Sequence, residues 1–488
     1  MSGVIQDNFL RVLNPISGKE ISSIEVSSQE YIDDILEKSQ LYTIWENLNL
    51  DKRCDIINKF RKIIVSNRDS IEKILKSETE KTDNDIFIEM LTSLEHLKEI
   101  VKIARDGLKK ERRNAGIMKL KKAFVKYEPI GVVGIISPWN YPIATPLSAC
   151  VEALLAGNNV VLKPSEHTPL TISHIKELWD KYIGFNDAFN IIIGGPEVGN
   201  QLVVSDKTDL ICFTGSSRVG RSIAEVCGKM LKPVILELGG KDPMIILEDA
   251  DIDRSVDAAI WGGLSNAGQT CISVERIFAH EKVYPEVVEK LKREIQTLSS
   301  GKGETPIGAI SVDVSLEKIR DQVSEAKNNS DVFEGNADEG RFIPPCLVVN
   351  PPFEAKILQE ETFGPVMTIH PFQTDNDAIE LANKTGYGLS ASIFGKSKKR
   401  IAYISRRVNA GAVAINDVLT HYGIADLPFG GKGISGMGKV HGKEGLRAFS
   451  YQKSYMSNWI SFKSEFWWYK RSKKFAQVLR KWIKWQYS

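Results

Sequence analysis

Short apolar runs alternate with longer stretches of helical spacing through most of the chain. Runs rich in β-branched residues lie at 131–137, 159–164, 189–195, 209–215 and 233–240. Between them, stretches such as 169–182 and 217–230 have the apolar spacing of amphipathic helices. This alternation predicts a doubly wound parallel sheet, whose ligands bind beyond the carboxyl ends of the strands.

The pattern continues on both sides of this region. A second series of apolar runs between 243 and about 415 predicts a second α/β domain. Residues 28 to about 110 have helical spacing, which predicts a helical N-terminal region. The segments 117–129 and 446–456 mix aromatic, apolar and basic residues, which predicts extended structure in both, with a hairpin in the first.

The composition is that of an ordinary globular protein. Of the 488 residues, 42% are hydrophobic and 26% are charged, and the length corresponds to roughly three domains. The six cysteines show neither the spacing of a disulfide framework nor a CxxC motif, which favours a reducing compartment. The sequence shows no signal-peptide pattern and no membrane-spanning apolar stretch, so we expect a cytoplasmic protein.

Charge is distributed unevenly along the chain. The last thirty residues, 459–488, contain eight basic residues and one acidic residue, a net charge of +7. Since the whole chain carries +2, the rest of it carries −5. Five of the nine tryptophans also lie in this tail, interleaved with the basic residues.

If residues 473–485 are helical, the apolar side chains of this stretch share one face and the basic ones lie mostly elsewhere. The apolar residues are Phe475, Val478, Leu479, Trp482 and Ile483. A basic amphipathic helix rich in tryptophan suits an anionic membrane surface, so peripheral membrane association is the favoured hypothesis. The alternative is that this face packs on the body of the protein or on a partner subunit.

The candidate chemistry centres on one cysteine. Cys271 lies in the run NAGQTCIS, where Gly268 and other small residues let the backbone pass close to a ligand. Alone it is weak evidence, because a free cysteine is usually a small buried apolar residue. Glu237 ends the apolar run before LGGK, and a carboxylate there is either ion-paired or functional. Together they suggest a thiol nucleophile and a base.

Further motifs accompany this pair: SPWNYP with Asn140, KPSE at 163–166, and the pair EETFGPV (360–366) and LPFGGKGISGMG (427–438). With LELGGK and GQTCI, and in this order, they resemble the motifs of the aldehyde dehydrogenase superfamily over roughly residues 10–456. GQTCI and SGMGKVHGK are most similar to the class 3 branch, which includes fatty aldehyde dehydrogenases. The resemblance implies a Rossmann-type NAD-binding domain, an α/β catalytic domain and a small β oligomerisation arm.

The resemblance also implies where these parts lie. The NAD-binding domain would comprise 1–112 and 129–239, and the catalytic domain 240–445, with its last part returning toward the NAD-binding domain. The arm would comprise 113–128 and 446–458, followed by the basic tail. Because the arm is similar to assembly elements of the family, we expect a homodimer.

The implied activity is the NAD(P)-dependent oxidation of an aldehyde to the carboxylic acid. Cys271, as a thiolate, would attack the aldehyde carbon, so its site should favour ionisation. Asn140 and the Cys271 backbone N–H would hold the resulting oxyanion. Glu237 would deprotonate the water that hydrolyses the thioester, and would assist ionisation of Cys271.

The cofactor and substrate residues follow from the same resemblance. The implied cofactor-binding residues are Lys163, Glu166, Gly215, Ser216, Gly220, Glu361, Phe363 and Trp139. Lys163 and Glu166 would bind the adenosine ribose, and the carboxylate would repel a 2′-phosphate, which favours NAD over NADP. Gly215, Ser216 and Gly220 would form a pyrophosphate-side turn at a helix N-terminus. Tyr141 and Phe429 would line the substrate tunnel.

Two positions differ from the better-known tetrameric branches. Lys443 stands where those enzymes carry a glutamate, and Ala149 stands where they carry a lysine nine residues after the asparagine. A proton relay through those groups is therefore not expected, and Glu237 is the clear base. Both differences fit the class 3 branch, and with the tail they make a long-chain or lipid-derived aldehyde the expected substrate.

Other functions have less support. A CoA-acylating dehydrogenase or acyl reductase shares the thioester but passes it to a thiol, and Glu237 argues for hydrolysis instead. A non-catalytic protein on the same fold need not keep these motifs together. His421 and His441 have no HExxH pattern and no third ligand nearby in the sequence, so no metal site is predicted. The basic runs at 109–113 and 396–400 lack a nucleic-acid-binding motif, so no nucleic acid partner is predicted.

Overall fold

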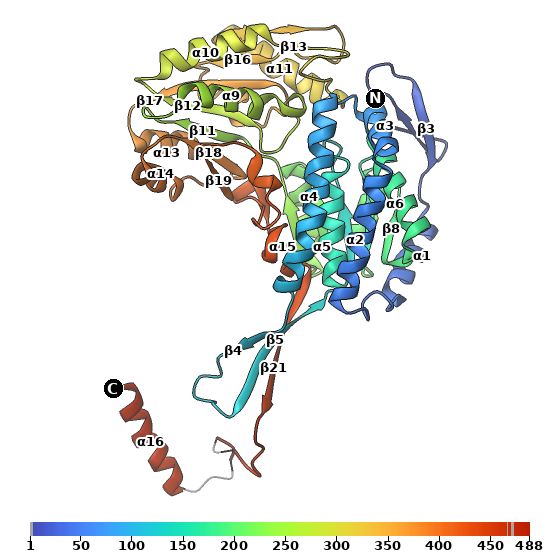
Figure 1. The fold of residues 1–488 in the computed structure, drawn as a ribbon, viewed down its shortest axis with the longest axis vertical. Helices are drawn as coiled ribbons and strands as arrows, with labels where there is room; N and C mark the ends of the chain where they lie inside the picture. Colours follow the sequence, from blue (N-terminus) through green and yellow to red (C-terminus); the bar gives the residue numbers. More distant parts are fainter. Residues whose placement is uncertain (1–2, 466, 470–472) are drawn as a thin grey trace. The chain divides into compact units, whose positions relative to one another are not determined.

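The computed structural model describes residues 3–465, 467–469 and 473–488, so Lys470 and Arg471 of the predicted basic tail lie outside the described residues. The chain forms two compact units (Figure 1). The larger unit comprises Met1–Leu108 and Glu128–Tyr451, and the smaller unit comprises Lys109–Tyr127 and Gln452–Ser488.

Within the described residues, the first large sheet of the larger unit has six strands in the order β20-β10-β9-β6-β7-β8. Its parallel strands are β6 (Val132–Ile136), β7 (Asn159–Lys163), β8 (Phe189–Ile191), β9 (Leu210–Thr214) and β10 (Val234–Glu237). Each coincides with a predicted apolar run, which confirms the doubly wound sheet. The edge strand β20 (Gly436–Met437) is antiparallel to β10 and was not predicted, because two residues carry no periodic pattern.

Helices surround this sheet. Those between its strands are α5 (Ala144–Ala156), α6 (Leu170–Tyr182), α7 (Pro196–Val204) and α8 (Ser217–Lys229). The predicted helical N-terminal region contains α1 (Gln29–Leu41), α2 (Leu50–Ser66), α3 (Arg68–Thr79) and α4 (Asp83–Gly107). Ser28, Asn49 and Thr82 cap α1, α2 and α4, because each side chain accepts a backbone N–H of the first turn. Helix α4 packs beside α2 and α5 (Figure 1).

The second large sheet has, in the described part of the chain, seven strands in the order β14-β16-β17-β12-β11-β18-β19. They are β11 (Asp242–Ile246), β12 (Val274–His280), β14 (Asp331–Glu334), β16 (Cys346–Val349), β17 (Val366–Phe372), β18 (Ser390–Phe394) and β19 (Ala412–Ile415). Its helices are α9 (Ile252–Leu264), α10 (Tyr284–Thr297), α11 (Asp313–Asn329), α12 (Lys356–Gln359), α13 (Asp375–Asn383) and α14 (Lys398–Ser405). The second predicted α/β series is therefore confirmed. Strands β13 (Ser299–Ser300) and β15 (Asn336–Ala337) form a separate two-stranded parallel sheet.

Three segments differ from the prediction. The hairpin predicted within 117–129 was wrong in its bounds, because that segment holds only the strand β5 (Lys121–Pro129), and its antiparallel partner β4 (Glu111–Arg113) lies before it. Near the N-terminus, β1 (Gly3–Gln6), β2 (Phe9–Leu13) and β3 (Glu20–Glu25) form an antiparallel sheet for which no element was predicted. The predicted strand 446–456 was wrong at its beginning, where helix α15 (Gly442–Ala448) ends and strand β21 (Ser450–Asn458) begins only later. Leu446 and Phe449 are both buried at the i, i+3 spacing of a helical turn, which explains the difference.

The smaller unit contains a sheet in the order β21-β5-β4, formed with β4 (Glu111–Arg113) and β5 (Lys121–Pro129). The first residues of the tail pack on it. The Trp459 backbone N–H donates to the Leu120 carbonyl at 2.9 Å, and Lys122 Nζ lies 4.6 Å from the centre of the Trp459 ring. Lys121 Nζ lies 2.5 Å from Glu465 Oε1.

The rest of the tail is helical. Helix α16 (Lys473–Tyr487) confirms the helix predicted over 473–485, and none of its residues is buried. The tail thus combines a segment that packs on the sheet with an exposed amphipathic helix. In the part of the chain that the structure describes, no helix is both long and apolar enough to cross a membrane.

Candidate functional site

A cavity of about 620 Å³ lies in the larger unit at the carboxyl ends of β6, β9 and β10. This is the edge at which doubly wound sheets bind their ligands. The predicted site residues that line it are Cys271, Glu237, Asn140, Gly215, Ser216, Glu361, Phe363, Trp139, Tyr141 and Phe429. The structure therefore brings together motifs that are spread over almost 300 residues of sequence.

Cys271 follows a turn with an unusual backbone conformation. Residues 266–268 have φ values of 53°, 54° and 70°, and non-glycine residues with positive φ store strain, which concentrates at functional sites. The Asn266 side chain fastens the turn by donating to the carbonyls of Asn140 and Gln269 at 3.0 and 3.2 Å. The turn is thereby held in place, and Cys271 faces the cavity.

Asn140 helps to hold this loop. Its buried Nδ2 donates to the Gln269 carbonyl at 2.8 Å, an interaction that the sequence did not predict. The hydroxyls of Tyr141 and Thr270 are also 2.8 Å apart. The SPWNYP segment and the cysteine loop are thus joined by several hydrogen bonds. Because an amide has two N–H groups, Asn140 keeps a second one for another acceptor.

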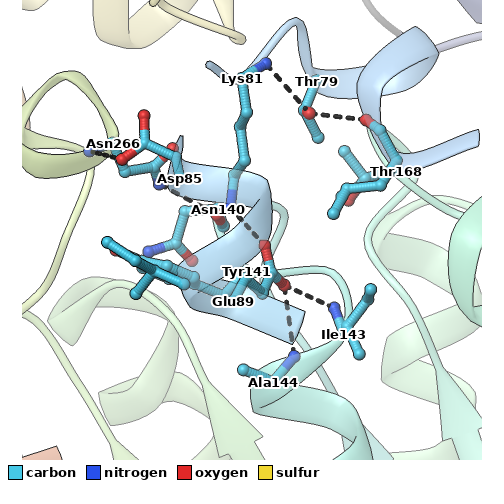
Figure 2. A network of polar contacts seen from close by, with 12 residues as sticks. Thr79, Lys81, Asp85, Glu89, Asn140, Tyr141, Ile143, Ala144, Thr168 and Asn266 are labelled. Carbon is cyan, nitrogen blue, oxygen red and sulfur yellow. Dashed lines mark hydrogen bonds and ion pairs between the residues drawn. The ribbon is translucent and has the colours of Figure 1, made fainter. Parts of the chain in front are cut away.

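A buried ion pair that contacts the SPWNYP segment and the beginning of α5 was also not predicted (Figure 2). Lys81 Nζ lies 2.5 Å from Glu89 Oε2, and both side chains are buried. Glu89 Oε1 accepts the N–H groups of Ile143 and Ala144 at 2.8 and 3.3 Å, at the beginning of α5. Lys81 Nζ also lies 4.2 Å from the centre of the Tyr141 ring. No local pattern signals this support, because it acts on a segment more than 50 residues away.

Glu237 is the other catalytic candidate. It ends β10 and is buried, and neither carboxylate oxygen has a hydrogen-bond partner among the described residues. Burial raises the pKa of Glu237 well above its usual range; Lys439 opposes this shift and Glu152 adds to it. A Cβ on Gly430 would lie 2.7 Å from Glu237 Oε1, so the glycine makes room for the carboxylate. A buried, unpaired carboxylate in a cavity is a candidate base.

The surroundings of Cys271 oppose its ionisation, which contradicts the expectation that they favour it. Burial is the main reason that the pKa of the thiol is raised. The negative charges of Glu361, Asp242 and Glu237 raise it further. The sequence could not show this effect, because the carboxylates converge on the sulfur only in the folded chain. A base is therefore needed to form the thiolate.

Glu361 and Phe363 also line the cavity. Glu361 Oε1 accepts the Gly240 N–H at 2.9 Å, and burial, with the charge of Glu275, raises the pKa of Glu361 to about 7. Glu275 also accepts the Phe363 N–H at 3.1 Å and so fixes the loop. The Phe363 ring meets Trp139 edge-on, with 5.5 Å between ring centres. These contacts form a partly aromatic wall of the cavity.

Lys163, Glu166 and Gly220 do not line the cavity. At the end of β7, Lys163 Nζ lies 2.9 Å from Glu166 Oε2; burial opposes ionisation of Glu166, but Lys163 brings its pKa below the usual value. Ser216 caps α8, as predicted for a turn at a helix N-terminus. Gly220 lies within α8, where a Cβ would be 2.5 Å from Leu238 Cδ2, so it serves close packing.

The two positions that differ from the tetrameric branches have ordinary surroundings. Lys443 forms an ion pair with Asp106 in the larger unit. Ala149 lines the cavity without a polar group. Tyr422, which the sequence did not single out, also lines the cavity, and its ring meets Phe429 edge-on at 4.9 Å.

Known proteins resemble this chain over most of its length. The sequence model described as the aldehyde dehydrogenase family matches residues 5–455. The chain is 32% identical over 466 residues to a Mycolicibacterium smegmatis protein provisionally named as an NADP(+) succinate-semialdehyde dehydrogenase, covering 91% of this chain and 89% of that protein. It is 31% identical over 459 residues to a 4,4'-diapolycopene aldehyde oxidase of Methylomonas sp, covering 92% and 86%.

The fold is also that of known structures. A crystal structure of a Mycobacterium tuberculosis aldehyde dehydrogenase complexed with NAD+ matches with a TM-score of 0.88 and 28% sequence identity. The match covers 94% of this chain and 96% of that one.

Proposed function

The chain belongs to the aldehyde dehydrogenase family, and from this premise we propose that it oxidises a long apolar aldehyde to the carboxylic acid through a thioester on Cys271. It is an oxidoreductase that acts on aldehydes with NAD(P) as cofactor. One observation carries the proposal: Cys271, Glu237 and Asn140 line a single cavity. Its other walls are largely aromatic and aliphatic.

The residues of this chain fit the cofactor. Ser216 caps α8, whose N-terminal N–H groups suit a pyrophosphate, and Glu361 and Phe363 line the cavity where a nicotinamide and its ribose would lie. Lys163 and Glu166, at the end of β7, would hold the adenosine ribose. When bound, the nicotinamide ring supplies the acceptor for the hydride of the aldehyde. The carboxylate of Glu166 favours NAD over NADP.

The reaction follows from the arrangement of the site. The Glu237 carboxylate removes the proton from Cys271 Sγ, and the thiolate adds to the aldehyde carbon. The second N–H of Asn140 and the Cys271 backbone N–H stabilise the oxyanion. Collapse of the oxyanion expels the hydride and leaves a thioester. Glu237 releases this proton to solvent and then takes a proton from a water molecule, which attacks the thioester and releases the acid and the Cys271 thiolate.

Replacing the nucleophile tests this mechanism. Cys271→Ala should lower aldehyde-dependent NADH formation by about 10⁴-fold or more, because the covalent route is lost. Cys54→Ala, in the buried face of α2, is the control and should keep the rate per folded molecule. Equal rates for Cys271→Ala and the native protein would overturn the mechanism. An absolute requirement for CoA would instead show the CoA-acylating reaction.

Aromatic and aliphatic walls support an apolar substrate such as those of the fatty aldehyde, or class 3, branch. The apolar wall residues include Ile88, Trp261, Leu419, Tyr422, Ile424 and Phe429. Lys318 also lines the cavity, but its charge acts on Glu361, on the side assigned to the cofactor. One relative is named as a 4,4'-diapolycopene aldehyde oxidase and another as a succinate-semialdehyde dehydrogenase. In an aldehyde series, kcat/KM should rise with chain length, and a preference for succinate semialdehyde would refute the proposal.

Assembly is the next proposal. Segments 113–128 and 446–458 would act as an oligomerisation arm between two copies of the chain. In the sheet of the smaller unit, β21 is an edge strand, and its residues are mostly exposed. Such an edge presents backbone groups to which another strand can pair. Sedimentation should show a dimer, and Met456→Pro, at this edge, should shift it toward the monomer.

The tail would bring the enzyme to a lipid surface. The apolar face of α16 includes Val478 and Ile483, which are 60% and 53% exposed, and basic residues lie beside it. Anionic vesicles should bind the full chain and not a chain lacking residues 460–488. Equal binding by both would support the alternative, in which this face packs against protein.

A further inference from the structure

We propose that His96, Glu152 and His441 form a binding site for a zinc ion in the core of the larger unit. His96 comes from α4, Glu152 from α5, and His441 immediately precedes α15. One nitrogen or oxygen atom from each residue can be chosen so that all three lie within 4.8 Å of one another. The side chains are buried, with residue exposures of 7%, 0% and 1%.

The two imidazoles lack the partners that buried polar groups normally have. None of the four ring nitrogens of His96 and His441 makes a hydrogen bond to the residues that the structure describes. Most buried side-chain polar atoms are hydrogen-bonded, because an unsatisfied one costs about 1–3 kcal/mol. The two ring centres lie 4.5 Å apart. A cation shared by both rings would satisfy one nitrogen of each.

The spacing of the donors suits a tetrahedral ion. His96 Nε2 and Glu152 Oε1 are 3.2 Å apart but are not aligned as a hydrogen bond. Two ligands with zinc bonds of about 2.0 Å at the tetrahedral angle lie about 3.3 Å apart. Side-chain rotation would have to bring the widest pair of ligand atoms closer by at most about 1.5 Å to reach this spacing.

Glu152 is already oriented by its neighbours. Both of its oxygens lie 3.1 Å from the His441 backbone nitrogen, whose N–H donates to them. Outer hydrogen bonds of this kind orient carboxylate ligands in metal sites. A Cβ on Gly445 would lie 2.7 Å from Glu152 Oε2, so the glycine leaves room at the carboxylate. The cluster is therefore held together before any ion binds.

The donor set selects the ion. Two imidazoles and one carboxylate are typical zinc ligands, whereas calcium and magnesium prefer oxygen donors. The earlier prediction of no metal site rested on ligands close in the sequence, but Glu152 and His441 are 289 residues apart. Ala149 on α5 and Val440 next to His441 line the catalytic cavity. Zinc would thus tie together two segments that form the cavity wall.

Direct binding to the full-length protein tests the proposal without aldehyde or cofactor, so its result does not depend on the proposed activity. After chelation and removal of the chelator, the protein should bind one zinc ion per chain, with a Kd of about 1 μM or below by calorimetry. Cobalt in place of zinc should give the strong visible absorption of a tetrahedral site. His96→Gln and Glu152→Gln should each weaken zinc binding by about 100-fold or more.

His421→Gln is the matched control, because His421 is also buried near the cavity and its ring nitrogens have no hydrogen bonds within the described chain. It should keep the native zinc affinity. Zinc should also raise the melting temperature of the native protein but not that of the Glu152→Gln variant. Binding of well under one equivalent by the native protein would overturn the proposal. Native zinc affinity in His96→Gln or in Glu152→Gln would also overturn it. If one of these variants does not fold, zinc binding by the other variant and by the native protein still tests the proposal.

Discussion

Glu89 and Glu237 are both buried glutamates of the larger unit, but their surroundings differ. Glu89 pairs with Lys81 and accepts two backbone N–H groups at the beginning of α5. The oxygens of Glu237 have no hydrogen-bond partner among the described residues. A buried carboxylate with its partners in place offsets its desolvation, and removing it leaves those partners unpaired, whereas an unpaired buried carboxylate costs free energy. The difference separates a carboxylate that holds the site from one that is available to react.

Of these two glutamates, Glu237 should show the larger effect on catalysis when it is replaced. Glu237→Gln should lower the steady-state rate of aldehyde oxidation by about 10²- to 10⁴-fold, because the amide cannot accept a proton. Because Glu237 acts on both the Cys271 thiol and the hydrolytic water, formation of the first NADH should slow as well, and stopped-flow measurements should show no burst. Glu225→Gln, on the exposed face of α8, is the control. A rate within twofold of the native protein would show that Glu237 is not the base.

Glu89→Gln should act on stability instead. Breaking the buried pair leaves Lys81 charged and unpaired, which should lower the free energy of unfolding by about 3–5 kcal/mol in urea denaturation. The double variant Lys81→Met with Glu89→Gln removes the unpaired charge and should recover part of this loss. If Glu89→Gln unfolds like the native protein while turnover falls as in Glu237→Gln, the distinction between the two carboxylates is wrong.

The pH dependence sharpens the same comparison. The pKa values of Glu237 and Cys271 are both raised, mainly by burial. In the proposed mechanism the Glu237 carboxyl first loses its proton to solvent, and its carboxylate then accepts the proton of the Cys271 thiol. The kcat/KM should therefore rise by about tenfold per pH unit above the usual range of a glutamate, until the pH reaches the raised pKa of Glu237. Glu237→Gln should remove this ionisation. A profile that falls with pH over this range would contradict the assignment.

The raised pKa of Glu237 also links pH to folding. Because the folded state favours the protonated carboxyl, its contribution to stability is present at low pH and is lost as the pH rises through the folded pKa. The native protein should therefore lose stability relative to Glu237→Gln as the pH increases. Thermal denaturation of both proteins over a pH series measures this difference, and parallel curves would contradict it.

Much of this site could be predicted from the sequence, because periodicity and local motifs record local structure. The apolar runs mark the parallel strands, and the motifs at their ends meet at the cavity. Contacts between distant segments produce no local sequence pattern. The role of Glu89 could therefore not be predicted, because it accepts the N–H of Ile143, 54 residues away. The raised pKa of the Cys271 thiol was mispredicted for the same reason, since it depends on carboxylates that only the folded chain brings near.

Glu166 is intermediate between the paired, buried Glu89 and the unpaired, buried Glu237. The smallest effect of a substitution is expected at Glu166. It is partly exposed, and its pairing with Lys163 at 2.9 Å keeps it charged next to the proposed ribose position. Glu166→Gln should remove the repulsion of a 2′-phosphate and raise the ratio of kcat/KM for NADP to that for NAD by about tenfold. Glu177→Gln, on the exposed face of α6, should leave the ratio unchanged. Because Glu166 is paired but solvent-accessible, its replacement should alter cofactor choice without the stability loss expected at Glu89. An unchanged ratio would indicate that the adenosine ribose of the cofactor does not bind next to Glu166.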